Sequence, residues 1–242
     1  MAHTVILQID DDTYELNSED YERLNKQNDL LICILLKRYQ YYGYVKEGIC
    51  LSANNIYDFI KKYKYTNETL EVFAGALNSN LPNYCSLFYD IEKYFGIGSF
   101  LTINISNFKY NILVSNPPYI NSVMNASSEI ILQLLKSTTN LLCIIVIPDW
   151  RSDKEYEQDI QVQLSSDEHI QDRQSTSYTN YTMVRQSPYF RHVLCIGDYK
   201  YHNYFKNTNK IIRDNTLIII LTNTIENDTK IALLLEWINL YI

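Results

Sequence analysis

Polar and apolar residues alternate at helical spacing over the first quarter of the chain. The segment Asn17-Ser18-Glu19-Asp20 is typical of a helix start, with acidic side chains in the first turn. Helical periodicity continues from there to about Tyr42. A second helix is predicted over residues 53–65. We therefore expect residues 1–68 to form a helical preface.

The remainder of the chain, residues 69–242, has a different pattern, in which short apolar runs alternate with polar segments. The runs that predict strands are LEVFAG (70–75), SFLTINI (99–105), NILVS (111–115), LLCIIVIP (141–148), RHVLCIG (191–197) and TLIIILT (216–222). Helices are predicted over residues 127–136 and 230–240. Strands that are apolar throughout and alternate with helices favour an α/β domain, with a mostly parallel sheet covered on both faces.

One stretch fits neither pattern. Residues 152–181 are dense in Ser, Thr, Asp, Glu and Gln and contain no Gly or Pro. A long polar segment in a compact domain is either a mobile functional loop or a solvated appendage, and its composition favours the appendage.

The charge balance restricts the nucleic-acid partners that the chain can have. The chain has 21 basic and 28 acidic residues, which gives a formal net charge of −7. Proteins that coat long nucleic acids need a broad basic face. A nucleic-acid partner of this chain must therefore be short or held locally. Most of the 22 tyrosines are expected to be half-buried.

Neither a targeting segment nor a metal site is predicted. The start MAHTVILQIDDD lacks a basic leader, and the longest apolar runs are far shorter than a membrane span. The five cysteines are widely spaced without a CxxC pair, which favours reduced thiols in an intracellular protein, nuclear or cytoplasmic. The four histidines also lack ligand spacing.

The tetrapeptide Asn116-Pro117-Pro118-Tyr119 follows the apolar run NILVS directly. Two prolines end a central strand, and they fix the backbone at the strand's carboxyl end, where open α/β sheets place their ligands. The Asn116 side-chain carbonyl and the Pro117 backbone carbonyl can each accept one hydrogen of an exocyclic amine, which orients the nitrogen for in-line attack on a methyl group. The Tyr119 ring offers a stacking face for an unstacked base. Adenine, cytosine and a glutamine amide all remain possible substrates, and an ordinary Pro-rich turn is the structural alternative.

A family resemblance narrows this choice. The segments that carry it are EVFAGALN (71–78), NYCSLFYDIEKYFG (83–96), SNPPY (115–119), VIPDWR (146–151), YFRHVL (189–194) and DNTLIIIL (214–221). In this order they resemble the phosphorylated-CTD-interacting-factor family of cap-specific mRNA adenosine methyltransferases. The resemblance covers roughly residues 70–222. It implies a class I, Rossmann-like enzyme that uses S-adenosylmethionine to methylate the 6-amino group of the (2′-O-methyl)adenosine beside the mRNA cap.

The resemblance also assigns residues. It matches Asn116, Pro117, Pro118 and Tyr119 to the catalytic and donor-contacting tetrapeptide, and Trp150 and Arg151 to a segment that faces the capped substrate. From the residues alone, Trp150 can stack on a methylated guanine and Arg151 can hold cap phosphates, although sealing the sheet edge is an equal alternative.

Further candidates come from position in the predicted fold. Phe73, Ala74, Leu77 and Asn78 follow the first strand, where such folds hold the donor, although Phe73 could equally belong to the core. Two arginines are candidates for phosphate contacts in the substrate, with a structural or solvated role as the alternative; they are Arg38 and Arg191.

The chain departs from the family pattern in places. We recognise no WW domain, so recruitment to phosphorylated polymerase tails is not implied. The segment between YFG and NPPY is shorter and rearranged, with Gly96-Ile97-Gly98-Ser99 where the family has more sequence. Asn121 stands where the family has an acidic residue. Two rival functions remain: the same chemistry on internal RNA, DNA adenine or a protein glutamine, and a catalytically silent cap-binding subunit of an mRNA-processing complex.

Overall fold

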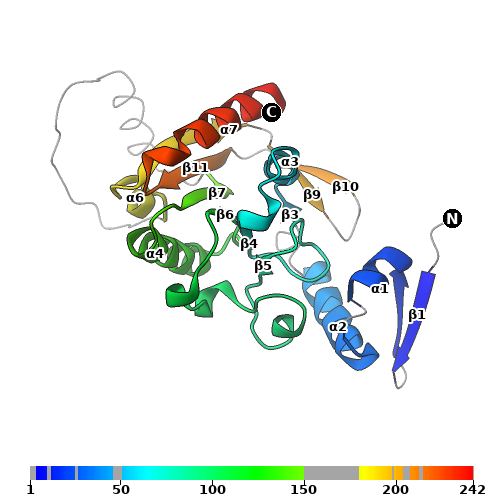
Figure 1. The fold of residues 1–242 in the computed structure, drawn as a ribbon. Coiled ribbons are helices and arrows are strands. Elements are labelled where there is room, and N and C mark those ends of the chain that lie inside the picture. Colours follow the sequence, from blue (N-terminus) through cyan, green and yellow to red (C-terminus); the bar gives the residue numbers. More distant parts are fainter. Residues whose placement is uncertain are drawn as a thin grey trace, which may run out of the picture.

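A six-stranded sheet with the order β5-β4-β6-β7-β11-β8 forms the centre of the molecule (Figure 1). The computed structural model describes residues 4–9, 12–24, 27–45, 51–149, 180–197, 199–203, 208–212 and 215–241. The strands of this sheet are β4 (Thr69–Val72), β5 (Tyr84–Cys85), β6 (Ile112–Ser115), β7 (Leu142–Pro148), β8 (Phe190–Ile196) and β11 (Thr216–Thr222).

The sheet is mostly parallel, as the apolar strands predicted. β5, β4, β6 and β7 pair in parallel, whereas β11 is antiparallel to both of its neighbours, β7 and β8. Every residue of β4, β6, β7 and β11 is buried. Apolar runs without alternation are the pattern expected of strands that are covered on both faces.

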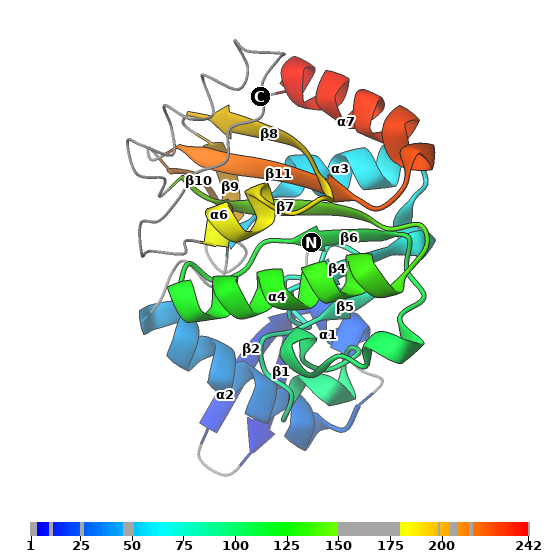
Figure 2. The same ribbon diagram turned by 90° about the vertical axis from the view of Figure 1, so that its left-hand side faces the viewer.

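Helices supply both covers (Figure 2). On one face α3 (Asn54–Lys62) and α7 (Asp228–Tyr241) pack against the side chains of Ile112 and Val114. On the other face α4 (Asn121–Ser137) and α6 (Asn180–Arg185) pack against Leu113 and its neighbours. Successive strand residues therefore enter opposite cores. The mixed α/β fold class is confirmed.

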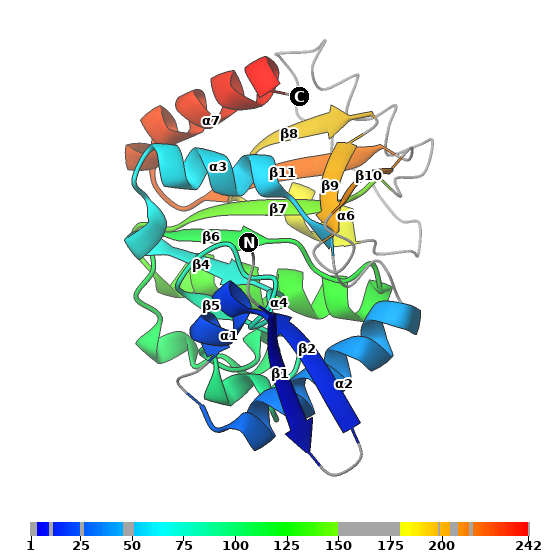
Figure 3. The ribbon, with the colours of Figure 1, turned by 90° about the vertical axis from the view of Figure 1, so that its right-hand side faces the viewer.

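The first residues differ from the expected helical preface. β1 (Thr4–Ile9) and β2 (Asp12–Asn17) form an antiparallel hairpin, followed by α1 (Ser18–Leu24) and α2 (Asp29–Val45) (Figure 3). The hairpin buries Leu7, Tyr14 and Leu16 on one face, and the alternation of Tyr14 and Leu16 with polar residues in β2 is the sequence signal for it. The single helix expected up to about Tyr42 is two helices.

The packing of α3 is relevant to the predicted boundary between a helical preface, residues 1–68, and an α/β domain, residues 69–242. Its side chains of Ile56, Phe59 and Ile60 are fully buried in the cluster that covers the sheet, so α3 is a cover of the sheet. The division itself stays a prediction.

The run SFLTINI is a further correction, because residues 99–105 do not form a strand. Two 3₁₀ turns, η4 (Phe100–Thr102) and η5 (Ile105–Asn107), occupy this region. The side chains of Ser99 and Asn104 accept hydrogen bonds from the backbone N–H groups of Leu101 and Ser106. Such local bonds compete with strand pairing.

The remaining elements lie around this core. They are β3 (Leu51–Ser52), β9 (Tyr199–Asn203) and β10 (Thr208–Ile212), which form a small sheet in the order β10-β9-β3, and the 3₁₀ turns η2 (Thr66–Glu68), η3 (Glu92–Tyr94) and η6 (Ile225–Asn227). Most of the polar stretch 152–181 lies outside the described residues, and its last two residues begin α6. Among the described helices, none has the length and apolar character needed to cross a membrane.

Candidate active site

The order of the strands creates a switch point between β4 and β6. From β4 the chain continues to β5 on one side, and it then returns to β6 on the other side. The two strands are parallel, and their last residues, Val72 and Ser115, are partners in the register. Phe73 and Asn116 therefore leave the sheet side by side. In open α/β sheets ligands bind at such a place, beyond the carboxyl ends of the strands.

A small hollow lies at this switch point. It is lined by Tyr57, Glu71, Val72, Phe73, Ala74, Asn78 and Asn116, and its volume is about 10 Å³. Four residues that the sequence assigned to the donor site thus share one hollow, namely Phe73, Ala74, Asn78 and Asn116. The volume suffices for one small group.

The tetrapeptide is held firmly in place. Pro117 and Pro118 are buried, and the Pro118 carbonyl accepts a hydrogen bond of 2.7 Å from the Ile120 N–H. The Asn116 Oδ1 atom is buried and accepts no hydrogen bond from the described residues, although the residue makes other interactions. The half-buried Tyr119 ring packs against the core cluster beneath α3 and α7. The tetrapeptide therefore combines two buried prolines with a buried amide oxygen, and Asn116 lines the hollow.

The loop that follows β4, residues 73–81, carries backbone strain at its start. Phe73 has a φ of 66°, in the left-handed region that non-glycine residues rarely adopt. Its ring meets the Phe100 ring edge to face, with centroids 5.6 Å apart, which offsets part of this cost. Strained residues of this kind cluster at functional sites.

Two buried carboxylates hold the loop, and sequence reasoning missed both. The Glu71 carboxylate accepts hydrogen bonds from the N–H groups of Asn80 and Leu81, at 2.7 and 2.9 Å. The Glu92 carboxylate accepts from the Ala76 N–H at 3.1 Å and from the Tyr39 hydroxyl at 2.9 Å. An acidic residue inside the otherwise apolar run LEVFAG was the available signal for Glu71.

Burial dominates the electrostatics of both groups. Desolvation raises the pKa of Glu71 to about 7, against the lowering effect of its hydrogen bonds from Asn80, Leu81 and Tyr57. Desolvation also raises the pKa of Glu92 to about 7. Both carboxyls therefore change protonation near neutral pH.

Other candidate residues are not brought to the hollow. Leu77 is buried in a separate cluster with Leu24 and Leu35 of the first helices, so its side chain faces away from the proposed donor. Arg191 lies on β8, which β7 and β11 separate from β6, and its guanidinium donates to the Pro188 and Phe190 carbonyls.

Arg38 is also engaged by the protein itself. Its guanidinium forms a two-pronged ion pair with Asp90, and this hydrogen bonding lowers the pKa of Asp90 to about 2. The Arg38 guanidinium also lies 5.4 Å from the centroid of the Phe88 ring. Trp150 and Arg151 lie outside the described residues. In the described ranges, no three His, Cys, Asp or Glu side chains form a group that could hold a metal ion.

Comparison with known proteins adds relatives to this geometry. Two curated proteins, each called mRNA (2′-O-methyladenosine-N(6)-)-methyltransferase, from Mus musculus and Homo sapiens, are 33% identical to this chain over 122 residues. The match covers 48% of this chain but only 17% of each relative. A solved structure titled "Conversion of a Disulfide Bond into a Thioacetal Group during Echinomycin Biosynthesis" aligns over 79% of this chain and 90% of its own, with a TM-score of 0.41 and 10% identity.

A family model extends over a larger part of the chain than these relatives do. It is described as the phosphorylated CTD interacting factor 1 WW domain, and it matches residues 11–182. The matched span runs from the turn of the first hairpin into α6, and it includes β4, β6, the loop 73–81 and the tetrapeptide. Since more than half of the sequence matches, the chain belongs to the phosphorylated CTD interacting factor 1 family.

Proposed function

We propose that the chain is a methyltransferase that uses S-adenosylmethionine to methylate the 6-amino group of the adenosine next to an mRNA cap. The observation that carries this proposal is the juxtaposition of Asn116 with Phe73 and Ala74 at the switch point. The names of the curated relatives support the substrate, since both act on 2′-O-methyladenosine in mRNA.

The architecture supports a Rossmann-like, class I assignment. The sheet is doubly wound, with α3 and α7 on one face and α4 and α6 on the other. Its switch point lies at the carboxyl ends of two central parallel strands, the place where doubly wound folds bind their cofactors.

The residues at the switch point fit a donor of this type. The strained backbone at Phe73 and the small Ala74 side chain leave the backbone of the loop close to the carboxyl end of β6. Asn78 and Asn116 offer neutral amide groups, which do not repel a sulfonium cation. When bound, S-adenosylmethionine supplies an electrophilic methyl group. Because the hollow has a volume of only about 10 Å³, most of such a molecule would lie beyond it.

The tetrapeptide would act on the amine. Asn116 Oδ1 and the Pro117 carbonyl would each accept one N–H of the 6-amino group, and would fix the nitrogen lone pair in line with the methyl group. The Tyr119 ring would stack on the adenine after a modest rotation away from the apolar cluster that it now contacts. We assign Trp150 and Arg151 to the cap, by stacking and by phosphate contact.

A substrate panel tests this proposal. The protein is incubated with labelled S-adenosylmethionine and, in turn, capped RNA that begins with 2′-O-methyladenosine, the same RNA without a cap, duplex DNA and a glutamine peptide. We expect methylation of the capped RNA and at most traces with the other three. Equal transfer to uncapped RNA, or transfer to DNA or peptide alone, would contradict the cap assignment.

The silent-subunit alternative makes a different prediction. A cap-binding scaffold would bind a cap analogue and would not bind S-adenosylhomocysteine, as measured by calorimetry. We expect the chain to bind both compounds.

A further inference from the structure

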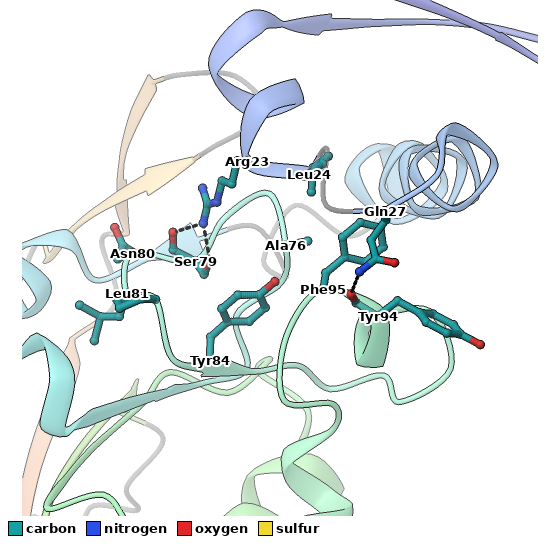
Figure 4. Close-up of a pocket in the computed structure, with 11 residues that line it drawn as sticks. Arg23, Leu24, Gln27, Ala76, Ser79, Asn80, Leu81, Tyr84, Tyr94 and Phe95 are labelled. Atoms are coloured by element: carbon teal, nitrogen blue, oxygen red, sulfur yellow. Dashed lines mark hydrogen bonds between the residues drawn. The ribbon is translucent and has the colours of Figure 1, made fainter.

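A larger cavity lies on the other side of the loop 73–81. Its volume is about 440 Å³, which is in the size range of small-molecule sites. Figure 4 shows its lining, which comes from α1, the connection between α1 and α2, the loop with Pro82, β5, and the end of η3 with the residue after it. The lining residues are Arg23, Leu24, Gln27, Ala76, Ser79, Asn80, Leu81, Pro82, Tyr84, Tyr94 and Phe95.

Arg23 gives the cavity a positive charge. It lies in the last turn of α1, and its Nη2 group donates to the carbonyl and the hydroxyl of Ser79 (Figure 4). These hydrogen bonds fix the guanidinium at the edge of the cavity. Within the described part of the chain no carboxylate forms an ion pair with it. The remaining N–H groups of the guanidinium can therefore bind an anion, for which a phosphate is the best match in shape.

The Tyr84 hydroxyl is an independent sign of a ligand. The Tyr84 side chain is only 8% exposed, and Figure 4 shows its hydroxyl directed into the space between Ala76 and Phe95. No hydrogen bond to this hydroxyl is found among the described residues. The hydroxyl faces the cavity, where it can donate a hydrogen bond to, or accept one from, a polar group of a bound molecule.

The Tyr84 ring is held in its position by close packing. A Cβ atom on Gly96 would lie 2.6 Å from the ring, so a residue without a side chain is required there. Phe95 lines the same cavity, so two aromatic side chains border this space (Figure 4). A planar ring can stack or pack in such a setting.

Aromatic and basic side chains also lie at the outer edge of the cavity and next to it. The Tyr94 side chain is 45% exposed and points away from the interior (Figure 4). The Lys93 ammonium lies 5.1 Å from the Tyr94 ring and 5.0 Å from the Tyr89 ring. Exposed aromatic rings interleaved with a cation are typical of surfaces that bind single-stranded nucleic acid.

The cavity is separate from the hollow that contains Asn116. Ala74 and Asn78 face the hollow, whereas Ala76 and Ser79 face the cavity. The loop 73–81 separates the hollow from the cavity, and the hydrogen bonds that Glu71 and Glu92 accept from its N–H groups hold it in place. A base in the cavity is therefore not the base that would react at Asn116.

We propose that this cavity binds one nucleotide of the RNA strand other than the methylated adenosine, with the phosphate at Arg23 and the base or sugar at Tyr84 and Phe95. This inference rests on the proposed function, because it takes RNA as the substrate. Binding of one nucleotide at a single site also agrees with the acidic net charge of −7, which excludes a broad basic surface for RNA.

Binding measurements without turnover test the inference. The probes are adenosine 5′-monophosphate, adenosine, and a labelled tetra-adenylate RNA, titrated into the wild type and into Arg23→Gln and Tyr84→Phe. Loss of the charge in Arg23→Gln should weaken AMP and RNA binding about 10-fold, and loss of one hydrogen bond in Tyr84→Phe should weaken both about 3- to 10-fold. Adenosine, which lacks the phosphate, should bind equally to the wild type and to Arg23→Gln.

The controls separate this inference from the proposed function. Lys136→Gln removes an exposed cation of α4, and Tyr110→Phe removes a hydroxyl outside the cavity, so both should bind AMP like the wild type. Tyr84→Phe should fold as stably as the wild type, since the hydroxyl lacks a protein partner in the described region.

Three results would overturn the inference. The first is unchanged AMP and RNA binding in both cavity variants. The second is AMP binding that the RNA does not displace, which would make the site one for free nucleotides. The third is displacement of AMP by S-adenosylhomocysteine, which would make the cavity part of the donor site. The proposed function survives each of them, because methyl transfer to capped RNA is measured separately.

Discussion

The two sides of the loop 73–81 differ in nearly every physical property. The side that faces Asn116 is a hollow of about 10 Å³ beside two buried prolines, whereas the side that faces Arg23 is a cavity of about 440 Å³. The hollow contains the Glu71 carboxyl and the strained backbone of Phe73, whereas the cavity contains the Arg23 guanidinium and the Tyr84 hydroxyl. A small rigid site suits the positioning of reacting atoms, and a larger charged one suits the binding of a substrate unit.

The same loop builds both sites, so its anchors should connect them. Glu71 holds its last residues and Glu92 holds its middle. A Cβ on Gly75 would collide with the Tyr39 hydroxyl, which is itself bonded to Glu92. The loop is thus fixed from the sheet and from α2, which explains how one short segment can serve two different surfaces.

The largest effect is expected from Asn116→Ala, which removes a side chain of the hollow and leaves the cavity unchanged. Removal of one amine acceptor should lower kcat for methyl transfer about 100-fold or more. AMP binding should not change, and S-adenosylhomocysteine binding should weaken far less than kcat falls, as measured by calorimetry. The matched control is Asn107→Ala, an exposed residue of η5 that should retain full activity. A variant with normal kcat would remove Asn116 from the chemistry.

Glu71→Ala should damage both sides at once. It leaves the buried N–H groups of Asn80 and Leu81 without their acceptor, which should cost about 2–4 kcal/mol of unfolding free energy. Chemical denaturation measures this loss, and Glu129→Ala on the exposed surface of α4 is the control. Both activity and AMP affinity should fall together. If only one of them falls, the loop does not connect the two sites.

Gly96→Ala should affect the cavity alone. The new Cβ would press on the Tyr84 ring at 2.6 Å, so the ring must shift, at a cost of about 1–3 kcal/mol. We expect weaker AMP binding with unchanged S-adenosylhomocysteine binding. Gly197→Ala is the matched control, because a Cβ there would meet nothing closer than the Asn215 side chain at 3.5 Å. Unchanged AMP affinity in Gly96→Ala would show that the ring position does not matter.

A further effect is a pH dependence of stability, which changes neither binding site. The pKa values of Glu71 and Glu92 are raised from 4.5 in the reference state to about 7 in the folded protein, so the folded state binds more protons over this range. Their stabilising contribution is therefore complete below pH 4.5 and is lost as the pH rises through about 7. The midpoint of thermal unfolding, followed by circular dichroism, should therefore decrease as the pH rises from 4.5 through about 7. Glu71→Gln should reduce its slope, and an equal slope in the variant would contradict the assignment to Glu71.

Sequence patterns predicted the sheet better than its surroundings. β6, β7 and β11 agree with apolar runs because a strand buried on both faces needs apolar residues at nearly every position. β8 lies at the edge of the sheet and agrees with a predicted strand although its residues are only partly buried or exposed. Residues 99–105 form turns instead of a strand, because the Ser99 and Asn104 side chains bond to nearby backbone N–H groups. The first hairpin was missed because β1, TVILQI, shows no alternation of polar and apolar residues, although only one of its faces is buried.

The sequence predicts the position of candidate residues that directly follow a strand. It does not predict the position of residues that only tertiary packing brings together. The sequence could place Asn116 and Phe73 at the carboxyl end of the sheet because each directly follows a strand, and their roles stay predictions. It could not tell that the Leu77 side chain lies in the cluster under the first helices, because position in a loop does not show which way a side chain points. The cavity could not be found at all, because Arg23 and Tyr84 come together only when α1 packs against the loop.

A crystal structure with S-adenosylhomocysteine would test the central claim most directly, because it shows which side of the loop holds the donor. We predict density at the carboxyl ends of β4 and β6, in contact with Asn116 and with the backbone of Phe73 and Ala74, and an unchanged cavity beside Arg23. Density in the cavity between Arg23 and Tyr84, with none at the switch point, would contradict both the proposed site and the division of labour across the loop.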